Sequence, residues 1–494
     1  MKFVVCGVGA AGTFTVARLA ELSAERRPDG AWSGVEVVLV DTPTALGRGR
    51  AFDADVDSAS INTSHRRLGM LSPDFHDFVG WSHAVGVTFG SPDDPPMPRS
   101  RYGDYLAATL SRALRILRAN GVRVHLLPGA TTRVVPSARG VDVEADTGGV
   151  VGADAVVLAT GGWSSTPDVT LASHGLTYVA QPYPLARSLR TMAEHRKVAI
   201  LGAGLTAVDI ACSLDGTETQ VHLLSRSGRL PRVQVDDTAS GPVPVALTEQ
   251  GVDDLRRKGG LTAESLLALL DTELARFDMD RGMLADDELL RRHWQAPEAD
   301  VVDRACHRVL SATNHALNAG FGALPAPDRA RVRSALDHEW QRYRVRIPVA
   351  RWAQLTRMIS EGRLVVHADV DARSPHLADA VAQVGATCVV NATGQSCDTT
   401  AGPALVRSLV AEGTVGTDVG GRGLVDPATG RAIGADGSVD PRLLVTGHLT
   451  AGSTLMVSAL DVVHRQARTA TDTLAATHLA TPSASPVHEK VTMP

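Results

Sequence analysis

The sequence predicts an α/β fold in which two βαβ units are combined with a helical insertion. Two observations predict the βαβ units: a short apolar stretch runs directly into a glycine-rich turn at residues 2–12, and the same arrangement returns at residues 197–207. A third observation predicts the insertion, because leucine and alanine recur at spacings of three and four between residues 246 and 345. At 494 residues the chain is long enough for two or three domains.

The first unit has the spacing of a phosphate-binding turn. The strand at residues 2–6 is followed by Gly7, Gly9 and Gly12, then by an alanine-rich helical stretch and a second buried strand that ends at Asp41. The first glycine permits a tight turn, the second lets the backbone approach a pyrophosphate, and the third lets the helix pack closely on the strand. The helix N-terminus then meets the phosphate charge, and the terminal acid accepts hydrogen bonds from ribose hydroxyls. This unit therefore predicts a Rossmann-like dinucleotide-binding domain.

The second unit repeats the pattern with one substitution. Its strand leads into Gly202 and Gly204, and Ala207 takes the place of the third glycine, which the fingerprint accepts. Where NAD-binding proteins carry an acid at the end of the next strand, this chain has Ser225 and Arg226. A guanidinium there suits a 2′-phosphate, so the sequence favours NADPH over NADH, although a solvated surface arginine would give the same pattern.

Further strands end in glycines that belong to the same architecture. One strand ends in Ala-Thr-Gly at Gly161 and another at Gly394, and the last strand ends at Gly447, ahead of a helix predicted from residue 455 to about 475. In flavoproteins with two dinucleotide domains, small residues at such strand ends let the backbone pass close to the cofactor. Two βαβ units, each with its own Ala-Thr-Gly strand, predict FAD in the first domain and NADPH in the second, with hydride passing to the flavin. Thr454, at the start of the last helix, is expected near the flavin.

These elements divide the chain into four parts. They are a discontinuous FAD-binding domain at 1–165 and 380–480, an NADPH-binding domain at 190–245 and 346–380, the helical insertion at 246–345, and a loose tail at 481–494. The insertion is expected to cap a substrate cleft or to support a homo-oligomer. Its His307 and His315 are about two helical turns apart, but no carboxylates accompany them, so no metal site is expected.

Composition excludes several other classes. The chain has 49 basic and 54 acidic residues, a net charge of −5, and only 4% aromatic side chains, so we expect no binding to nucleic acid. The sequence contains no run of 18 apolar residues, so no membrane span is expected. No secretory signal precedes the first strand, so a cytoplasmic protein with reduced thiols is expected. Disulfide reductases carry a CxxC or CxxxxC pair beside the flavin, and no such pair occurs among Cys6, Cys212, Cys306, Cys388 and Cys397.

Segments between the motifs resemble a known family. They are Gly49-Arg50-Ala51-Phe52, Ile61-Asn62, Met70, Phe78, Trp81, Arg101-Tyr102-Gly103, residues 202–209 and residues 340–348. In these segments the chain is similar to the FAD/NAD(P)-binding domain shared by FAD-dependent urate hydroxylase and the aspartate N-hydroxylating, nitrosuccinate-forming monooxygenases. It resembles the lysine and ornithine N-hydroxylases more distantly, through the two-cofactor layout. The resemblance implies a monooxygenase cycle: NADPH reduces FAD, oxygen adds at flavin C4a, and the hydroperoxide delivers one oxygen atom to a nucleophilic substrate.

The resemblance also suggests roles for individual side chains. Asn62 is the candidate nearest the flavin ring, where a neutral amide can hold the peroxide or the substrate. His65 is a candidate base that deprotonates an ammonium group before N-oxygenation. A loop-stabilising asparagine and a structural histidine are the alternatives. A substrate carboxylate is expected to bind Arg66 or Arg101, with Arg67 and Arg99 as further candidates, and each of these arginines could instead lie on the surface or bind FAD phosphate.

The function that these features favour is NADPH- and FAD-dependent hydroxylation, with O2, of a small, polar, nitrogen-containing metabolite. N-hydroxylation of an amino acid is the first expectation, and ring hydroxylation of a purine-like compound is the second. A flavin reductase or dehydrogenase that transfers no oxygen is the rival from another class. Two intact glycine motifs disfavour a nucleotide-sensing scaffold without catalysis.

Overall fold

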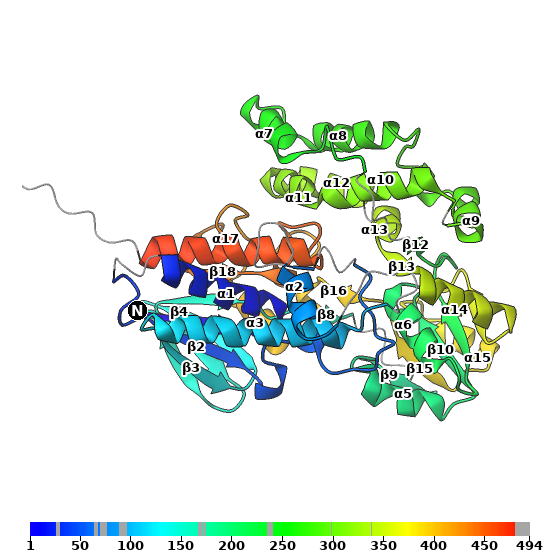
Figure 1. The fold of residues 1–494 in the computed structure, drawn as a ribbon, viewed down its shortest axis with the longest axis horizontal. Coiled ribbons are helices and arrows are strands. Elements are labelled where there is room, and N and C mark those ends of the chain that lie inside the picture. Colours follow the sequence, from blue (N-terminus) through cyan, green and yellow to red (C-terminus); the bar gives the residue numbers. More distant parts are fainter. Residues whose placement is uncertain are drawn as a thin grey trace, which may run out of the picture.

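The computed structural model (Figure 1) describes residues 1–25, 30–63, 68–69, 77–87, 96–165, 171, 174–234, 241–297, 299–336 and 338–479. Two mainly parallel sheets lie side by side, and a layer of helices lies over them at the top of this view. The arrangement confirms the predicted α/β fold, with two Rossmann-like domains and a helical insertion.

The first sheet has six strands in the order β17-β18-β7-β1-β2-β3, and all pairs are parallel except β17 with β18. The strands are β1 (Lys2–Cys6), β2 (Glu36–Asp41), β3 (Arg123–Pro128), β7 (Ala155–Leu158), β17 (Arg431–Ile433) and β18 (Val439–Val445). Its central strands are almost continuously apolar, as expected for a sheet that is covered on both faces.

Different elements cover the two faces of this sheet. One face packs against the helices α1 (Ala10–Glu25), α3 (Arg99–Ala119) and α17 (Leu460–His478). The other face packs against an antiparallel sheet of β4 (Thr131–Ser137), β5 (Gly140–Ala145) and β6 (Val150–Ala153), and against α16 (Ala404–Ala411). The short helix α2 (Asp77–Ala84) packs beside α3.

The second sheet has the order β14-β11-β10-β15-β9 and is parallel throughout. The strands are β9 (Thr177–Val179), β10 (Lys197–Leu201), β11 (Gln220–Leu224), β14 (Leu364–His367) and β15 (Cys388–Asn391). The helices α5 (Leu185–Ala193), α6 (Leu205–Leu214) and α14 (Val349–Ser360) cover one face, and α15 (Leu377–Val384) covers the other.

This sheet corrects the predicted domain bounds. The strand β9 joins it ahead of residue 190, and β15 pairs with β10 although it falls within the segment 380–480 that we predict for the first domain. Position along the chain misleads here, because pairing with neighbouring strands decides to which sheet a strand belongs. A two-stranded ribbon of β8 (Trp163–Ser164) and β16 (Gln395–Ser396) then links the chain segments that pass between the two domains.

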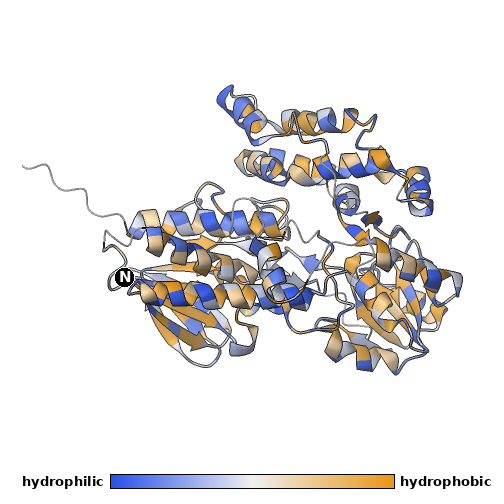
Figure 2. Cartoon of the chain, in the orientation of Figure 1, coloured by the Kyte–Doolittle hydropathy of each residue, from blue (hydrophilic) through white to orange (hydrophobic). Residues whose placement is uncertain are grey.

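The insertion consists of short helices whose sequence supplies their own caps. They are α7 (Glu249–Arg257), α8 (Ala263–Ala275), α9 (Asp287–Gln295), α10 (Val301–Ala312), α11 (Asn314–Ala323), α12 (Ala326–Ala335) and α13 (His338–Arg344). The side chains of Thr248, Thr262, Asp286 and Asp300 each accept the N–H three residues further on, as N-cap residues do. Apolar residues of these helices pack into one core. In Figure 2, apolar residues (orange) are concentrated on the two sheets and alternate with hydrophilic ones (blue) along the insertion helices.

The insertion leaves the second domain through β12 (Arg232–Gln234) and returns through β13 (Arg346–Pro348), and these two strands pair in parallel. Its apolar core also takes in Leu455, Met456 and Val462 of the first domain. The insertion therefore contacts both domains.

The last helix begins later than the sequence pattern predicts. α17 starts at Leu460 rather than at residue 455, and the preceding segment forms the 3₁₀ turn η7 (Gly447–Thr450) and further turns. The N–H groups of Leu455 and Met456 are bonded to a side chain of the insertion, Asn318, instead of lying in a helix. Thr454 consequently lies in the segment between η7 and α17 and not at the helix start.

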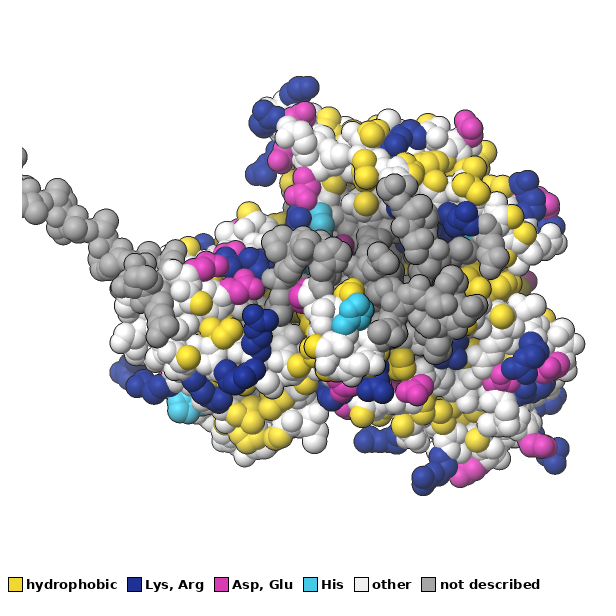
Figure 3. Space-filling view, in the orientation of Figure 1, with side chains coloured by type: hydrophobic (Ala, Val, Ile, Leu, Met, Phe, Trp, Pro, Cys, Tyr) yellow, Lys and Arg dark blue, Asp and Glu magenta, His cyan; other side chains and the backbone are white. Residues whose placement is uncertain are grey.

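Among the residues that the structure describes, no helix is long and apolar enough to cross a membrane. On the face drawn in Figure 3, basic and acidic side chains are interspersed over the parts that are not grey.

Candidate active site

The carboxyl ends of three parallel strands meet at one edge of the first sheet. Cys6 pairs with Leu158, and Leu158 pairs with Val445, so β1, β7 and β18 end at the same level. Two backbone hydrogen bonds continue past the strand ends, from Ala159 N–H to the Cys6 carbonyl at 2.8 Å and from Thr446 N–H to the Leu158 carbonyl at 2.9 Å. The glycine turn after β1, the Ala-Thr-Gly segment after β7 and the η7 turn therefore lie together, at the edge where doubly wound sheets bind ligands.

The three glycines of the turn after β1 are too tightly packed to carry side chains. Gly7 has a φ of +87°, and a Cβ there would lie 2.4 Å from the Ala159 carbonyl oxygen. A Cβ on Gly12 would lie 2.1 Å from the Gly7 carbonyl oxygen, so α1 packs directly against the turn. A Cβ on Gly9 would lie 3.1 Å from the Cα of Gly49. The fingerprint does not reveal this last contact, in which the loop that carries Gly49 folds against the turn.

Asp41 lies beside the turn at the end of β2. Its Oδ2 accepts the Val8 N–H at 2.6 Å, and its Oδ1 accepts the Thr42 N–H at 2.7 Å. These bonds fix the carboxylate against the turn, and each oxygen keeps a lone pair that could accept a ribose hydroxyl.

The same edge also has uncrowded glycines. Gly161 and Gly447 have φ values of +72° and +74°, and no atom lies within 4 Å of a Cβ built on either one. The Gln466 amide orders the segment after β18: its Oε1 accepts the Gly447 N–H at 2.9 Å, and its Nε2 donates to the hydroxyls of Thr450 and Thr454 at 2.9 and 3.0 Å. The tight turn at Gly7–Gly12, the Asp41 carboxylate beside it and the uncrowded glycines Gly161 and Gly447 together fit a dinucleotide cofactor.

The second sheet repeats this geometry. Gly202 has a φ of +111°, and a Cβ there would lie 2.7 Å from the carbonyl oxygen of Ala392, which belongs to the second Ala-Thr-Gly segment. Gly204 is the N-cap residue of α6, where no side chain caps the helix. Ala207 is fully buried in the first turn of that helix. Gly204 and Gly394 both face open space. The first glycine of each turn therefore packs on the alanine carbonyl of its own Ala-Thr-Gly strand.

Arg226 follows β11 at the position where a coenzyme ribose is expected. Its side chain is exposed and has no hydrogen-bond or ion-pair partner among the described residues. The neighbouring Ser227 hydroxyl accepts a hydrogen bond from Arg342 of α13, so a second guanidinium reaches this strand end. The sequence does not reveal Arg342 as a candidate, because 115 positions separate it from Ser227.

Arg99 joins the two domains. Its Nη2 donates to Asp209 Oδ2 of α6 at 2.7 Å, and the Tyr183 hydroxyl donates to the same oxygen at 2.6 Å. Burial raises the pKa of Asp209, against the opposing charge of Arg99. The Arg99 guanidinium is thus engaged at the contact between the domains, and its role in binding a substrate carboxylate stays a prediction.

Two further predicted site residues, Asn62 and Arg101, lie around the start of α3. Asn62 is half-buried, and its side chain has no hydrogen-bond partner among the described residues. Arg101 is on the first turn of α3, exposed, with Nη1 3.7 Å from Asp104 Oδ2. His65, Arg66 and Arg67 lie outside the described residues.

The cysteines are unsuited to dithiol chemistry. Burial raises the pKa of Cys6 and Cys212 to about 12 and that of Cys306 and Cys388 to about 11, and it also raises the pKa of Cys397. All five are free thiols, and they stay protonated at neutral pH.

His448 is a candidate that the sequence motifs do not single out. It belongs to η7 and is only 8% exposed, and its ring centroid lies 6.4 Å from that of Trp163 in β8. Burial lowers the pKa of His448 to about 4, so its imidazole is neutral at pH 7. A neutral imidazole beside the strand end can both donate and accept a hydrogen bond. Its position directly after Gly447 is the only sequence signal for it.

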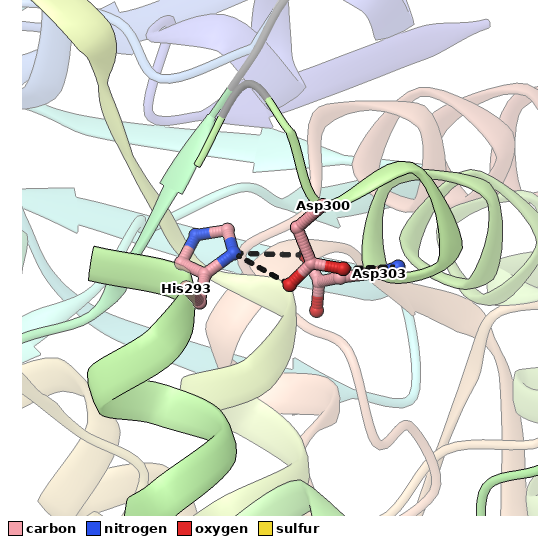
Figure 4. Close-up of side chains that lie close together, drawn as sticks. All are labelled: His293, Asp300 and Asp303. Atoms are coloured by element: carbon pink, nitrogen blue, oxygen red, sulfur yellow. Dashed lines mark hydrogen bonds and ion pairs between the residues drawn. The ribbon is translucent and has the colours of Figure 1, made fainter. Parts of the chain in front are cut away.

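A second cluster of buried polar groups lies where the insertion joins the second domain (Figure 4). His293 Nδ1 lies 3.4 Å from Asp300 Oδ2 and 3.5 Å from Asp303 Oδ2. His293 Nε2 accepts the Val233 N–H at 2.9 Å, so a neutral ring carries its proton on Nδ1, the atom that faces the carboxylates. Asp303 is also paired with Arg346, at 2.5 Å. A protonated Nδ1 and a guanidinium-paired carboxylate do not suit a metal ion, and this cluster is structural.

Comparisons with known proteins agree with this geometry. Residues 4–162 match the family model described as FAD-NAD(P)-binding, and residues 197–258 match that of the pyridine nucleotide-disulphide oxidoreductases. No curated protein sequence matches the chain.

Two solved structures are similar over almost the whole chain. One is FAD-bound DfoA, the cadaverine monooxygenase of the desferrioxamine pathway of Erwinia amylovora, with 14% identity, a TM-score of 0.55 and coverage of 100% of this chain and 97% of that one. The other is the reduced ornithine hydroxylase PvdA of Pseudomonas aeruginosa, with 16% identity, a TM-score of 0.52 and coverage of 97% and 99%. At these identities the likeness shows the fold. Together with the two family models, it identifies the chain as a flavoprotein oxidoreductase that binds FAD and NAD(P).

Proposed function

We propose that this chain is an FAD-dependent monooxygenase that uses NADPH to hydroxylate a small, polar, nitrogen-containing metabolite. The net reaction consumes one NADPH, one proton and one O2 for each substrate, and it yields NADP⁺, hydroxylated product and water. The observation that carries the proposal is the duplicated packing of Gly7 on Ala159 and of Gly202 on Ala392, which prepares two dinucleotide edges in one chain.

The choice of oxygen as electron acceptor has its own support. A flavin that passes electrons to a protein disulfide needs a reactive dithiol, whereas four of the five cysteines here are buried, Cys397 is partly buried, and burial raises the pKa of each thiol. A flavin reductase or dehydrogenase that releases electrons without oxygen transfer is the alternative that the experiment below distinguishes.

An amine or amino acid is the substrate class that we favour. The two similar structures are those of a cadaverine monooxygenase and an ornithine hydroxylase, and both cadaverine and ornithine carry a primary amine. The resemblance to the aspartate N-hydroxylating monooxygenases points the same way. Ring hydroxylation of a purine-like compound, by resemblance to urate hydroxylase, is the second choice.

The residues take the following proposed roles. FAD is held by Gly7, Gly9, Gly12, Asp41, Gly161, Gly447 and Thr454, and NADPH is held by Gly202, Gly204, Ala207, Arg226 and Gly394. When bound and reduced, FAD supplies the electrons that activate O2. Asn62 and His448 offer neutral hydrogen-bonding groups to substrate or oxygen, His65 takes the proton from the substrate ammonium, and Arg66 and Arg101 bind its carboxylate. The insertion excludes water from the reacting groups.

A substrate panel tests this proposal. Amino acids, diamines and purines are added singly to the holoenzyme with NADPH and O2, while NADPH consumption, hydrogen peroxide and hydroxylated product are measured. The correct substrate should give product and NADPH consumption in equal amounts, with little peroxide. Stoichiometric peroxide with every compound would favour the reductase alternative.

The charge of Arg226 should decide coenzyme preference. Arg226→Glu removes a guanidinium from the 2′-phosphate and adds a carboxylate, so we expect the KM for NADPH to rise by about 10- to 100-fold. NADH has no 2′-phosphate, so its KM should change by no more than about threefold. Both values are measured as the steady-state rate of flavin-dependent coenzyme oxidation.

Arg187 provides the control for this substitution. It is exposed on α5, so Arg187→Glu changes the net charge equally at another site of the same domain and should leave both KM values unaltered. If Arg226→Glu raises the KM for NADPH and the KM for NADH equally, Arg226 does not bind the 2′-phosphate.

A further inference from the structure

The turn segment after β18 is held from two sides. From the first domain, the Gln466 amide bonds the Gly447 N–H and two threonine hydroxyls, and the Ser453 hydroxyl bonds the backbone of Val425. From the insertion, side chains of α11 and α12 contact backbone groups of residues 451–456. We call residues 451–456 the flavin-side loop, because they continue from the strand end beside the FAD-binding turn.

Asn318 of α11 makes the central contact from the insertion. Its Oδ1 accepts the N–H groups of both Leu455 and Met456, at 2.9 and 3.1 Å. Two N–H donors can be satisfied only by the amide oxygen, so the orientation of the side chain is determined. The Asn318 Nδ2 is buried and has no hydrogen-bond partner among the described residues. Acceptance of the two N–H groups is therefore what this side chain contributes.

Neighbouring groups of the insertion support the same loop. Arg333 donates from Nη2 to the Ala451 carbonyl at 2.5 Å. The helix α11 also comes so close that a Cβ on Gly322 would lie 3.1 Å from the Ser453 carbonyl oxygen. The insertion thus contacts backbone polar groups at both ends of the flavin-side loop and at its middle.

The N–H groups of residues 451–454 bond backbone carbonyls, whereas those of Leu455 and Met456 depend on the Asn318 side chain. Leu455 and Met456 are 6% and 5% exposed, and α17 begins only at Leu460. A buried N–H that loses its acceptor is costly, so a loop without Asn318 would rearrange to find other partners. Because the loop follows Gly447 and contains Thr454, such a rearrangement would reach the FAD site.

We infer that Asn318 is a positioning residue for FAD: the helical insertion sets the conformation of the flavin-side loop through this side chain, in addition to covering the substrate side. The inference rests on FAD binding to the first domain and not on the oxygen chemistry. It gives the insertion a task in the resting holoenzyme, before any substrate is present.

Two substitutions at Asn318 test the inference by FAD binding. Asn318→Leu keeps a similar volume and removes the acceptor, whereas Asn318→Asp keeps an oxygen that can accept both N–H groups. FAD is titrated into apoprotein while flavin fluorescence is followed, and the circular dichroism of bound flavin is recorded without NADPH. We expect Asn318→Leu to bind FAD at least about tenfold more weakly and to change the flavin circular dichroism. Asn318→Asp should retain wild-type affinity within about threefold.

Thr272→Val is the control for these substitutions, and two results would contradict the inference. Thr272 is exposed on α8 and bonds only the Ala268 carbonyl of its own helix, so Thr272→Val should change neither readout. If Asn318→Leu lowers only the melting temperature and leaves FAD affinity and the flavin spectrum unchanged, the side chain is merely structural and the inference fails. It fails equally if Asn318→Asp is as weak as Asn318→Leu. Absence of hydroxylated product in the substrate panel would leave this result untouched, so the two proposals fail separately.

Discussion

Gly7→Ala is expected to abolish FAD retention and to lower the free energy of unfolding by about 3 kcal/mol. The added Cβ meets the Ala159 carbonyl oxygen at 2.4 Å, and this atom belongs to the backbone of the neighbouring strand and cannot rotate away. A φ of +87° adds strain of about 1–2 kcal/mol for an L-residue, and forced backbone shifts cost about 1–3 kcal/mol more. The flavin content of the purified protein and its chemical denaturation midpoint measure the two effects.

Gly34 separates the conformational strain from the overlap. It has a φ of +77°, but no atom lies within 4 Å of its Cβ position. Gly34→Ala should therefore lose about 1 kcal/mol and keep its flavin. Full flavin content in Gly7→Ala would contradict the assignment of the first turn to FAD.

Asp303→Asn should destabilise the junction of the insertion by about 3–5 kcal/mol. Asp303 is 5% exposed and pairs with Arg346 and Arg232, which are 2% and 4% exposed and occupy paired positions on β13 and β12. Burial alone would raise the pKa of Asp303, but the two guanidinium charges outweigh it and hold the pKa well below its usual value. Removing the carboxylate leaves two buried cations without a counter-charge. Tryptophan fluorescence during urea denaturation measures the loss, because Trp294 and Trp340 lie in the insertion.

The sign of the pH effect follows from the lowered pKa of Asp303. Its contribution is fully present above the unfolded pKa of about 4 and is lost as the pH falls below that value. Glu288→Gln is the matched control, because its ion pair with Arg291 is about 60% exposed on both sides and should be worth at most about 1 kcal/mol. Equal destabilisation by the two variants would show that the buried cluster does not hold the insertion.

The sequence predicts the two glycine turns well because their requirements are local. The positive φ at Gly7 and Gly202 and the packing of Gly12 on Gly7 follow from a strand, a turn and a helix within about a dozen residues. The contacts of Gly7 with Ala159 and of Gly202 with Ala392 come from distant strands, and the local pattern does not reveal them. Pairing between distant strands is not local, so the position of β15 in the chain predicts the first domain although the strand pairs with β10.

Side-chain roles were harder to predict because their partners are far away in sequence. Arg99 carries a guanidinium group that could bind a substrate carboxylate, but its partner Asp209 lies 110 positions away on another domain. Asn318 lies 137 positions before Leu455 and has no motif around it. Packing between domains determines these side-chain contacts. Hydrophobic periodicity predicts helices and strands within a segment and does not predict contacts between domains.

Oxygen transfer is tested most directly with isotopically labelled O2. The holoenzyme, NADPH and the substrate selected by the panel are incubated under labelled gas, and the product is analysed by mass spectrometry. The account predicts a product that carries one labelled oxygen atom for each NADPH consumed, with the second labelled atom in water. An unlabelled product, or labelled hydrogen peroxide with no product from any amine, amino acid or purine, would contradict the assignment as a monooxygenase.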